Sequence, residues 1–154
     1  MSRRVARETA LQILYQVDIS GEKDYQQALE NWALEFAVPA RSKEFTKTLV
    51  AGTLQYLSEI DAQLAATAHE WSIDRMSVVD RNIMRLAGYE MLYAEEETPH
   101  RVVLNEAVEM AKKFGGEDSA KFINGILDKL LDTSERIKKQ KKFKGENCGV
   151  VFRD

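Results

Sequence analysis

The sequence has little cysteine, proline or glycine, and it has no long apolar run. A single cysteine, Cys148, leaves no partner for an intrachain disulfide, and only two prolines and eight glycines interrupt 154 residues. Because about 18 consecutive apolar residues occur nowhere, a membrane-spanning helix is not predicted. The start MSRRVARET lacks the apolar core of a secretory signal, so we expect a cytoplasmic protein.

Motifs that carry catalytic or metal chemistry are also missing from the sequence. His69 and His100 lie far apart without HExxH spacing, and no Walker A or GxGxxG motif occurs. Cys148 has no neighbouring base that could activate it as a nucleophile. We therefore expect a non-enzymatic protein with no catalytic residues, no metal site and no cofactor.

Apolar residues instead recur at the i, i+3, i+4, i+7 spacing of a helix face in almost every segment, which predicts an all-α fold. The pattern predicts helices at about 3–18, 42–68 and 78–93, with Gly52 as a bend in the second and a link at 69–77. Another helix carries an aromatic stripe that we expect in the core. The stripe consists of Tyr25, Leu29, Trp32 and Phe36.

Residues 99–130 predict a helical hairpin. Its first helix should end at Gly115-Gly116, since glycine readily adopts the left-handed conformation that closes a helix. Asp118 or Ser119 is expected to cap the second helix. Within that helix stands Gly125, which costs roughly 1 kcal/mol relative to alanine, so we expect a neighbouring backbone to pack closely there.

Positive charge is concentrated at the two ends of a chain whose net charge is −3. Residues 1–7 hold three arginines and no acid, and residues 129–144 hold seven basic residues against two acidic ones. Between them, residues 8–128 hold 11 basic and 21 acidic residues. This distribution favours an anionic partner that is bound locally.

The start of the first predicted helix carries Arg3, Arg4 and Arg7, where cations oppose the helix macrodipole. These arginines are either an exposed, solvated helix end or a ligand-binding group. Tyr15 is either a core aromatic or a stacking platform beside this basic patch. We expect the arginines to contribute little to the core.

The hairpin corner offers the three kinds of contact that single-stranded RNA requires. Lys113 and Lys121 can contact phosphates, and Asp118 can accept hydrogen bonds from base edges. Phe122 can stack on a splayed base or fill the core, whereas Phe114 lies on the apolar stripe and is expected in the core.

The helix at 78–93 carries a charged flank that includes Asp80 and Arg85. The flank is either a surface with ion pairs between successive turns, each worth a few tenths of a kcal/mol, or a partner-binding face. Composition alone does not separate these two interpretations.

Three stretches together resemble the signature of the NusB family of bacterial transcription antitermination factors. They are RRVARETALQILYQ at 3–16, DRNIMRLAGYEMLY at 80–93 and PHRVVLNEAVEMAKKFGGEDSAKFINGILDK at 99–129. The resemblance implies about seven helices in two small bundles that share a core. It implies one RNA-binding domain at 1–135, with N-terminal helices at 3–68 and C-terminal helices at 78–134, followed by a basic, flexible tail at 136–154.

The resemblance also implies a function. The protein would bind the boxA element of RNA together with NusE, a ribosomal protein that doubles as an elongation factor. It would act on the RNA polymerase elongation complex with other Nus factors, chiefly at ribosomal RNA operons. Self-association into a homodimer stays open.

Carried over position by position, the resemblance assigns RNA contact and NusE contact to two distinct surfaces. The RNA surface holds Arg3, Arg4, Arg7, Tyr15, Asp118, Lys121 and Phe122. The NusE surface holds Asp80 and Arg85. Two rivals are a helical protein–protein scaffold without RNA affinity and the detached RNA-binding domain of an RNA methyltransferase; salt-dependent RNA binding excludes the scaffold.

Overall fold

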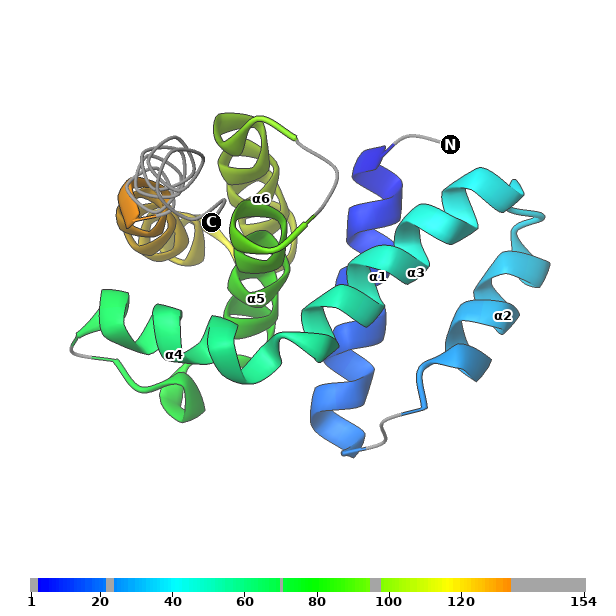
Figure 1. Cartoon of the computed structure of the whole chain (residues 1–154), viewed down its shortest axis with the longest axis horizontal. Coiled ribbons are helices and arrows are strands. Elements are labelled where there is room, and N and C mark those ends of the chain that lie inside the picture. Colours follow the sequence, from blue (N-terminus) through cyan, green and yellow to red (C-terminus); the bar gives the residue numbers. More distant parts are fainter. Residues whose placement is uncertain (1–2, 22–23, 70, 95–97, 134–154) are drawn as a thin grey trace, which may run out of the picture.

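The computed structural model describes residues 3–21, 24–69, 71–94 and 98–133, and all regular structure among them is helical (Figure 1). A last helical segment covers 117–133, and the short η1 is a 3-10 turn. The elements in chain order are α1 (Arg3–Ser20), α2 (Gln26–Glu35), α3 (Ala40–Gln55), α4 (Leu57–Ala68), η1 (Ile73–Arg75), α5 (Val78–Leu92) and α6 (His100–Phe114).

Helix α5 lies at the centre of the molecule, and every residue from Asn82 to Met91 is buried. Helices α1, α3, α4 and α6 all pack against it. The side chain of Ser77 accepts a hydrogen bond from the Asp80 amide at 3.0 Å and so caps α5 at its start.

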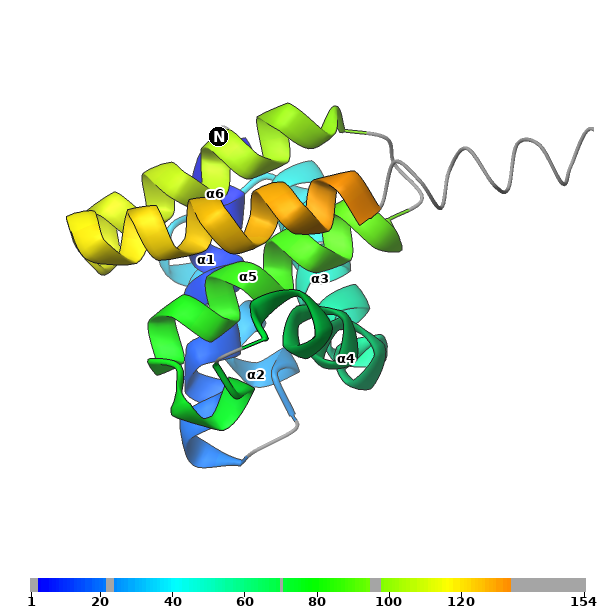
Figure 2. The same cartoon turned by 90° about the vertical axis from the view of Figure 1, so that its left-hand side faces the viewer.

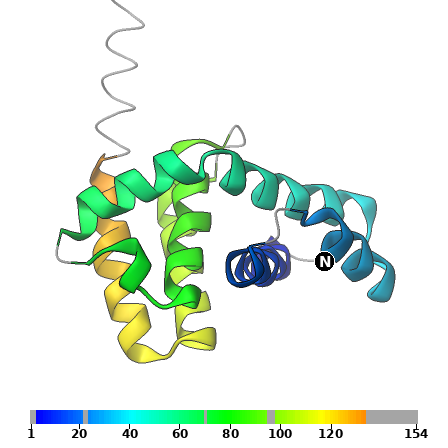
Figure 3. The ribbon, with the colours of Figure 1, turned by 90° about the horizontal axis from the view of Figure 1, so that it is seen from below.

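The helices form two groups around one continuous core. Figure 3 shows α1, α2 and α3 on one side, and α4, α5, α6 and the segment 117–133 on the other. The buried side chains of both groups belong to a single apolar cluster. The predicted all-α fold of two small bundles is therefore confirmed, but the boundary between the bundles falls at Tyr56, between α3 and α4, and not at the predicted link 69–77 (Figure 3). The division of the chain at residues 135 and 136 stays a prediction, because residues 134–154, with Cys148, lie outside the described residues.

The predicted helix at 42–68 is divided in two at Tyr56, where α3 ends and α4 begins in a new direction (Figure 1). The ring of Tyr56 stacks on that of Tyr93, with 4.4 Å between ring centroids. This turn lets α4 pack on α5. Gly52 is not the bend that we predicted; it is the point where the Tyr89 ring passes so close to α3 that a β-carbon would collide with it.

Helix α2 covers only part of α3, and the prediction that its aromatic stripe is core was only partly right. Leu29 is buried, but Phe36 is 63% exposed. Because α2 ends at Glu35, Phe36 does not continue the helix face that packs on the core.

The hairpin of α6 and 117–133 runs as two antiparallel helices (Figure 2). The expectation about Gly125 was wrong, since nothing lies within 4 Å of the position that its β-carbon would occupy. Gly125 is exposed on the outer side of its helix. In the described part of the chain, the helices are too short or too polar to cross a membrane.

Candidate nucleic-acid and protein interface

The start of α1 presents two of its arginines on the surface. Arg4 donates two hydrogen bonds, both at 2.9 Å, to the carboxylate of Glu106 on α6, and its side chain is 57% exposed. These hydrogen bonds and the charge of Arg4 lower the pKa of Glu106, although burial raises it. The Arg3 guanidinium lies 4.3 Å from the centre of the Phe45 ring, over its face. Both cations are thus oriented by neighbours and still accessible.

Arg7 is buried, so the expectation that it lies exposed on the first turns was wrong. Its guanidinium donates to both carboxylate oxygens of Glu90 on α5, at 2.9 and 2.8 Å, and both side chains are 5% exposed. The cause is its position on the inner face of α1, one residue after the buried Ala6. Arg7 therefore fastens α1 to α5.

A second contact continues along the same side of α1. Lys113, near the end of α6, donates to Glu8 at 2.9 Å and remains 58% exposed. Its ammonium is also 5.4 Å from the centre of the Phe114 ring. Phe114 is 38% exposed, so its predicted core position was wrong; it is the last residue of α6, where the helix leaves the core.

The corner of the hairpin differs from the prediction at its cap. Gly116 adopts a φ of +104°, as expected for a glycine corner, and the next helix already begins at residue 117. Asp118 therefore lies in the first turn of that helix, where a carboxylate interacts favourably with the helix dipole. Asp118 and Lys121 are exposed, and Phe122 is half-buried.

Trp71 is a member of this surface that sequence reasoning missed. Its ring packs edge-on against Phe122, with 5.5 Å between centroids, and it is 51% exposed. Trp71 lies in the link between α4 and η1, where no periodicity marks it. A tryptophan in a segment without apolar periodicity was the signal that could have identified it.

Asp80 lies beside the hairpin corner, not on a separate surface. A hollow of about 310 Å³ is lined by Trp71, Arg75, Met76, Ser77, Asp80, Asp118, Ser119 and Phe122. Within the described structure, the Oδ1 atom of Asp80 is buried and has no hydrogen-bond partner. The expectation of two distinct surfaces was therefore wrong, because the fold brings the start of α5 against the corner.

Arg85 belongs to a buried ion network, and its ion pairs join α5 to other helices. It donates to both oxygens of Asp61 on α4, at 2.8 and 2.9 Å, and to Asp18 on α1 at 3.1 Å. Arg81 also donates to Asp18, at 2.7 and 2.8 Å. Although burial raises the pKa of Asp18, hydrogen bonds from Arg81 and Asn82 and the charge of Arg85 bring it below its usual value.

Tyr15 is 38% exposed on α1, so its position fits the stacking platform better than the core aromatic. Glu8 lies four residues after Arg4, and Tyr15 lies seven residues after Glu8, so the three side chains share one row of the helix. The side chains of Arg4 and Glu8 both pair with residues of α6. These two ion pairs therefore hold the start of α1 beside α6, the helix whose last turn precedes the hairpin corner.

Comparison with known proteins gives consistent matches over most of the chain. The model of the NusB family matches residues 4–132. The transcription antitermination protein NusB of Desulfitobacterium hafniense is 51% identical over 134 residues, which are 86% of this chain and 90% of that protein. The protein of the same name from Desulforamulus reducens is 50% identical over 135 residues, which are 88% of this chain and 93% of that one.

Solved structures agree with this assignment. NusB of T. maritima superposes with a TM-score of 0.78 at 38% identity, covering 86% of this chain and 92% of that one. A chain in a crystal structure of antitermination factors NusB and NusE in complex with dsRNA superposes with a TM-score of 0.76 at 30% identity. The superposition covers 85% of this chain and 96% of that one. The chain belongs to the NusB family, a family of transcription antitermination proteins and not of enzymes.

Proposed function

We propose that the protein binds boxA-like single-stranded RNA together with NusE and acts in the cytoplasm on the RNA polymerase elongation complex, with other Nus factors, chiefly at ribosomal RNA operons. A related chain that is 30% identical was crystallised as a complex of NusB and NusE with dsRNA. That relative supports both an RNA and a NusE partner for this chain.

The observation that carries the proposal is that two ion pairs join the arginine start of α1 to α6, the helix that ends at the hairpin corner. Arg3 and Arg4 would contact phosphates at one end, and Lys113 would do so in the middle. Tyr15 would offer a ring on which a base can stack. At the corner, Lys121 would contact phosphate, Asp118 would accept from a base edge, and Phe122 would stack.

Arg7 has a different role in this proposal. Because its guanidinium is buried against Glu90, it contacts the protein and holds the start of α1 in place. The RNA surface would then depend on Arg7 for its shape and on Arg3 and Arg4 for its charge.

NusE would bind at the hollow where Asp80 lines one wall. Asp80 lines this hollow, and its negative charge would attract a basic group on NusE. Arg85 would support this surface indirectly, through Asp18 and Asp61. Since the hollow includes Asp118 and Phe122, NusE and RNA would bind side by side and cooperatively.

The test is a titration of labelled boxA-like RNA, both single-stranded and as a duplex, with and without saturating NusE. A coupling of about 1–3 kcal/mol should tighten RNA binding about 5- to 150-fold when NusE is present. Equal affinities in the two titrations would overturn the cooperative mechanism. No salt-dependent RNA binding in either titration would favour the protein scaffold.

Two variants locate the partners. Arg4→Glu should weaken RNA binding and lower the log–log salt slope by about 0.7 per lost phosphate contact on a single strand. Arg101→Glu is the matched control, because Arg101 also sits in an exposed ion pair, with Asp128, on the other side of α6. Asp80→Ala should remove the NusE effect and leave the binding of RNA alone unchanged.

A further inference from the structure

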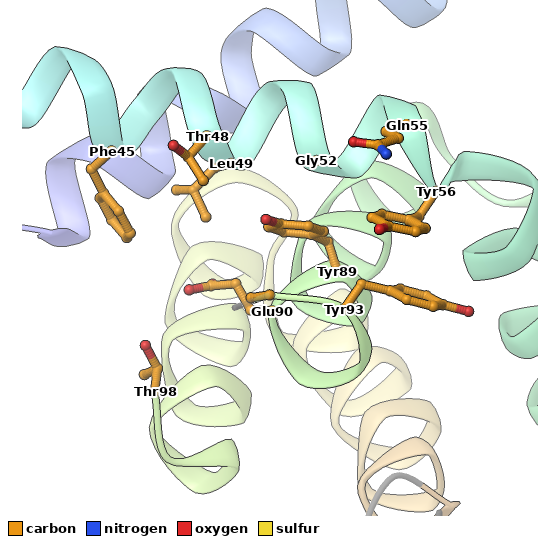
Figure 4. Close-up of a pocket in the computed structure, with 11 residues that line it drawn as sticks. Phe45, Thr48, Leu49, Gly52, Gln55, Tyr56, Tyr89, Glu90, Tyr93 and Thr98 are labelled. Atoms are coloured by element: carbon orange, nitrogen blue, oxygen red, sulfur yellow. The ribbon is translucent and has the colours of Figure 1, made fainter. Parts of the chain in front are cut away.

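A second hollow lies between α3 and the end of α5 (Figure 4). Its volume is about 330 Å³, within the roughly 300–1,000 Å³ range of pockets for small organic groups. Figure 4 shows Phe45 at one end, Tyr56 and Tyr93 at the other, and Glu90 between them. None of the residues that line it belongs to the RNA or NusE surfaces described above.

Aromatic rings form one end of this hollow. The rings of Tyr56 and Tyr93 are parallel to within 3°, with 4.4 Å between centroids. Tyr89 continues the stack at 6.4 Å from Tyr56, and it fits against α3 only because Gly52 has no side chain there. Gly52 makes room for the Tyr89 ring, and the stacked rings of Tyr56 and Tyr93 lie beside it. This end of the hollow is therefore aromatic.

The other end of the hollow connects directly with the arginine start of α1. Phe45 lines the hollow, and the guanidinium groups of Arg3 and Arg7 lie 4.3 and 5.7 Å from the centre of its ring. The carboxylate of Glu90 is paired with Arg7 on both oxygens, so it does not leave an unbalanced negative charge in the hollow. A phosphate held at Arg3 would be next to the Phe45 end of the hollow.

We propose that this hollow binds one unstacked nucleobase of the RNA, at the end of the bound segment that lies beyond Arg3. The inference rests on the proposed RNA-binding function and adds a base-binding subsite to it. Stacking on Tyr56 or Tyr93 suits any base, because every base has a flat face. Thr48, Gln55 and Thr98 line the hollow and can hydrogen-bond to a base edge.

The phenol of Tyr93 fits the same chemistry. Burial, and then the charge of Glu59, raise the pKa of Tyr93, so its hydroxyl keeps its proton at neutral pH. It can therefore donate a hydrogen bond and adds no charge that would repel a phosphodiester.

Photocrosslinking tests the subsite in the unmodified full chain. Single-stranded boxA-like RNAs carrying one 5-bromouridine at successive positions, including extensions at both ends, are irradiated with the protein and the crosslinked peptides are identified. A crosslink to Tyr56, Tyr89 or Tyr93 from a terminal extension is expected. Crosslinks confined to α1 and the hairpin corner, with RNA bound, would overturn the subsite and leave the proposed function standing.

Affinity gives a second, independent readout. Tyr93→Ala should weaken binding of the extended RNA about 5- to 150-fold, as expected for the loss of one stacked base, and Tyr93→Phe should keep most of the affinity. Phe36→Ala is the control, because Phe36 is an exposed aromatic on α2 outside the hollow. Circular dichroism melting of each variant shows whether it is folded at the binding temperature.

The outcomes separate the two proposals. Absence of RNA binding by the unmodified protein would overturn both. If Tyr93→Ala is folded, binds the extended RNA normally and loses affinity for NusE, the hollow is a protein contact and the subsite is wrong.

Discussion

Helix α5 and the helical segment 117–133 lie side by side in the same half of the molecule and use charged residues in opposite ways. On α5, Arg85 and Glu90 are buried and pair with residues from other helices. On 117–133, Asp118, Lys121 and Asp128 are exposed. The hairpin has the clearest sequence pattern in the chain, yet α5 is the element against which four other helices pack.

This difference shows which charges a partner can use. A buried charge that makes two hydrogen bonds to an opposite charge helps to hold two helices together. Removing it leaves its partner's charge buried and uncompensated. An exposed charge contributes little to stability and is available to RNA or protein. The three predictions below test that division and the packing around α5, in order of decreasing expected effect.

The largest effect is expected at the pair that joins α1 to α5. Arg7→Ala or Glu90→Ala should lower the free energy of unfolding by about 3–5 kcal/mol, because each leaves a buried charge without its partner. Urea denaturation followed by circular dichroism measures this change. The double variant Arg7→Met with Glu90→Leu should recover much of the lost stability, since it removes both charges and keeps the volume.

The matched control for this pair is Arg101→Ala, which breaks an exposed ion pair between α6 and 117–133. It should cost at most about 1 kcal/mol. Equal losses from Arg7→Ala and Arg101→Ala would contradict the division between buried and exposed charges.

Two glycines sharpen the comparison between the two helices. Gly52→Ala should destabilise the protein by about 1–3 kcal/mol, because the added methyl group meets the buried Tyr89 ring of α5. Gly125→Ala, on the open side of 117–133, should raise stability by up to about 1 kcal/mol through helix propensity. Thermal melting of the two variants measures both shifts. If Gly52→Ala and Gly125→Ala shift the melting temperature in the same direction, close packing against α5 does not decide the effect of the added methyl group.

The smallest effect is expected from acid titration of Asp18 at the other end of α1. Its pKa in the folded protein is below the usual 3.8, so the unfolded state takes up the proton first as the pH falls. The stabilising contribution is complete well above pH 3.8 and is lost as the pH falls toward the lowered pKa. Asp18→Asn should flatten this acid limb in urea titrations between pH 7 and pH 3.

The sequence predicts the features that depend on neighbouring residues. Helices at 3–18 and 78–93 were predicted, and α1 and α5 cover Arg3–Ser20 and Val78–Leu92. The glycine corner of the hairpin was also correct. In each case a local apolar period or a local stop signal was enough.

Features that depend on distant residues were not predictable from the sequence. Arg4 and Arg7 are one turn apart in a single arginine-rich stretch, and the buried partner of Arg7, Glu90, lies 83 residues away in the sequence. The break at Tyr56 depends on a ring 37 residues further along the chain. Of the candidate site, the exposed corner residues were predictable, whereas Trp71 and the position of Asp80 beside them required the fold.

Helix α1 is fastened to α5 at both ends, by Arg7 with Glu90 near its start and by Asp18 with Arg81 and Arg85 near its end. A helix held in this way keeps its orientation before any RNA arrives. RNA would therefore meet Arg3, Arg4 and Tyr15 on a preorganised scaffold, and the protein would lose little conformational entropy on binding. The entropic cost of forming the complex would fall mainly on the RNA strand, because the RNA loses base stacking and conformational freedom when it binds to a rigid surface.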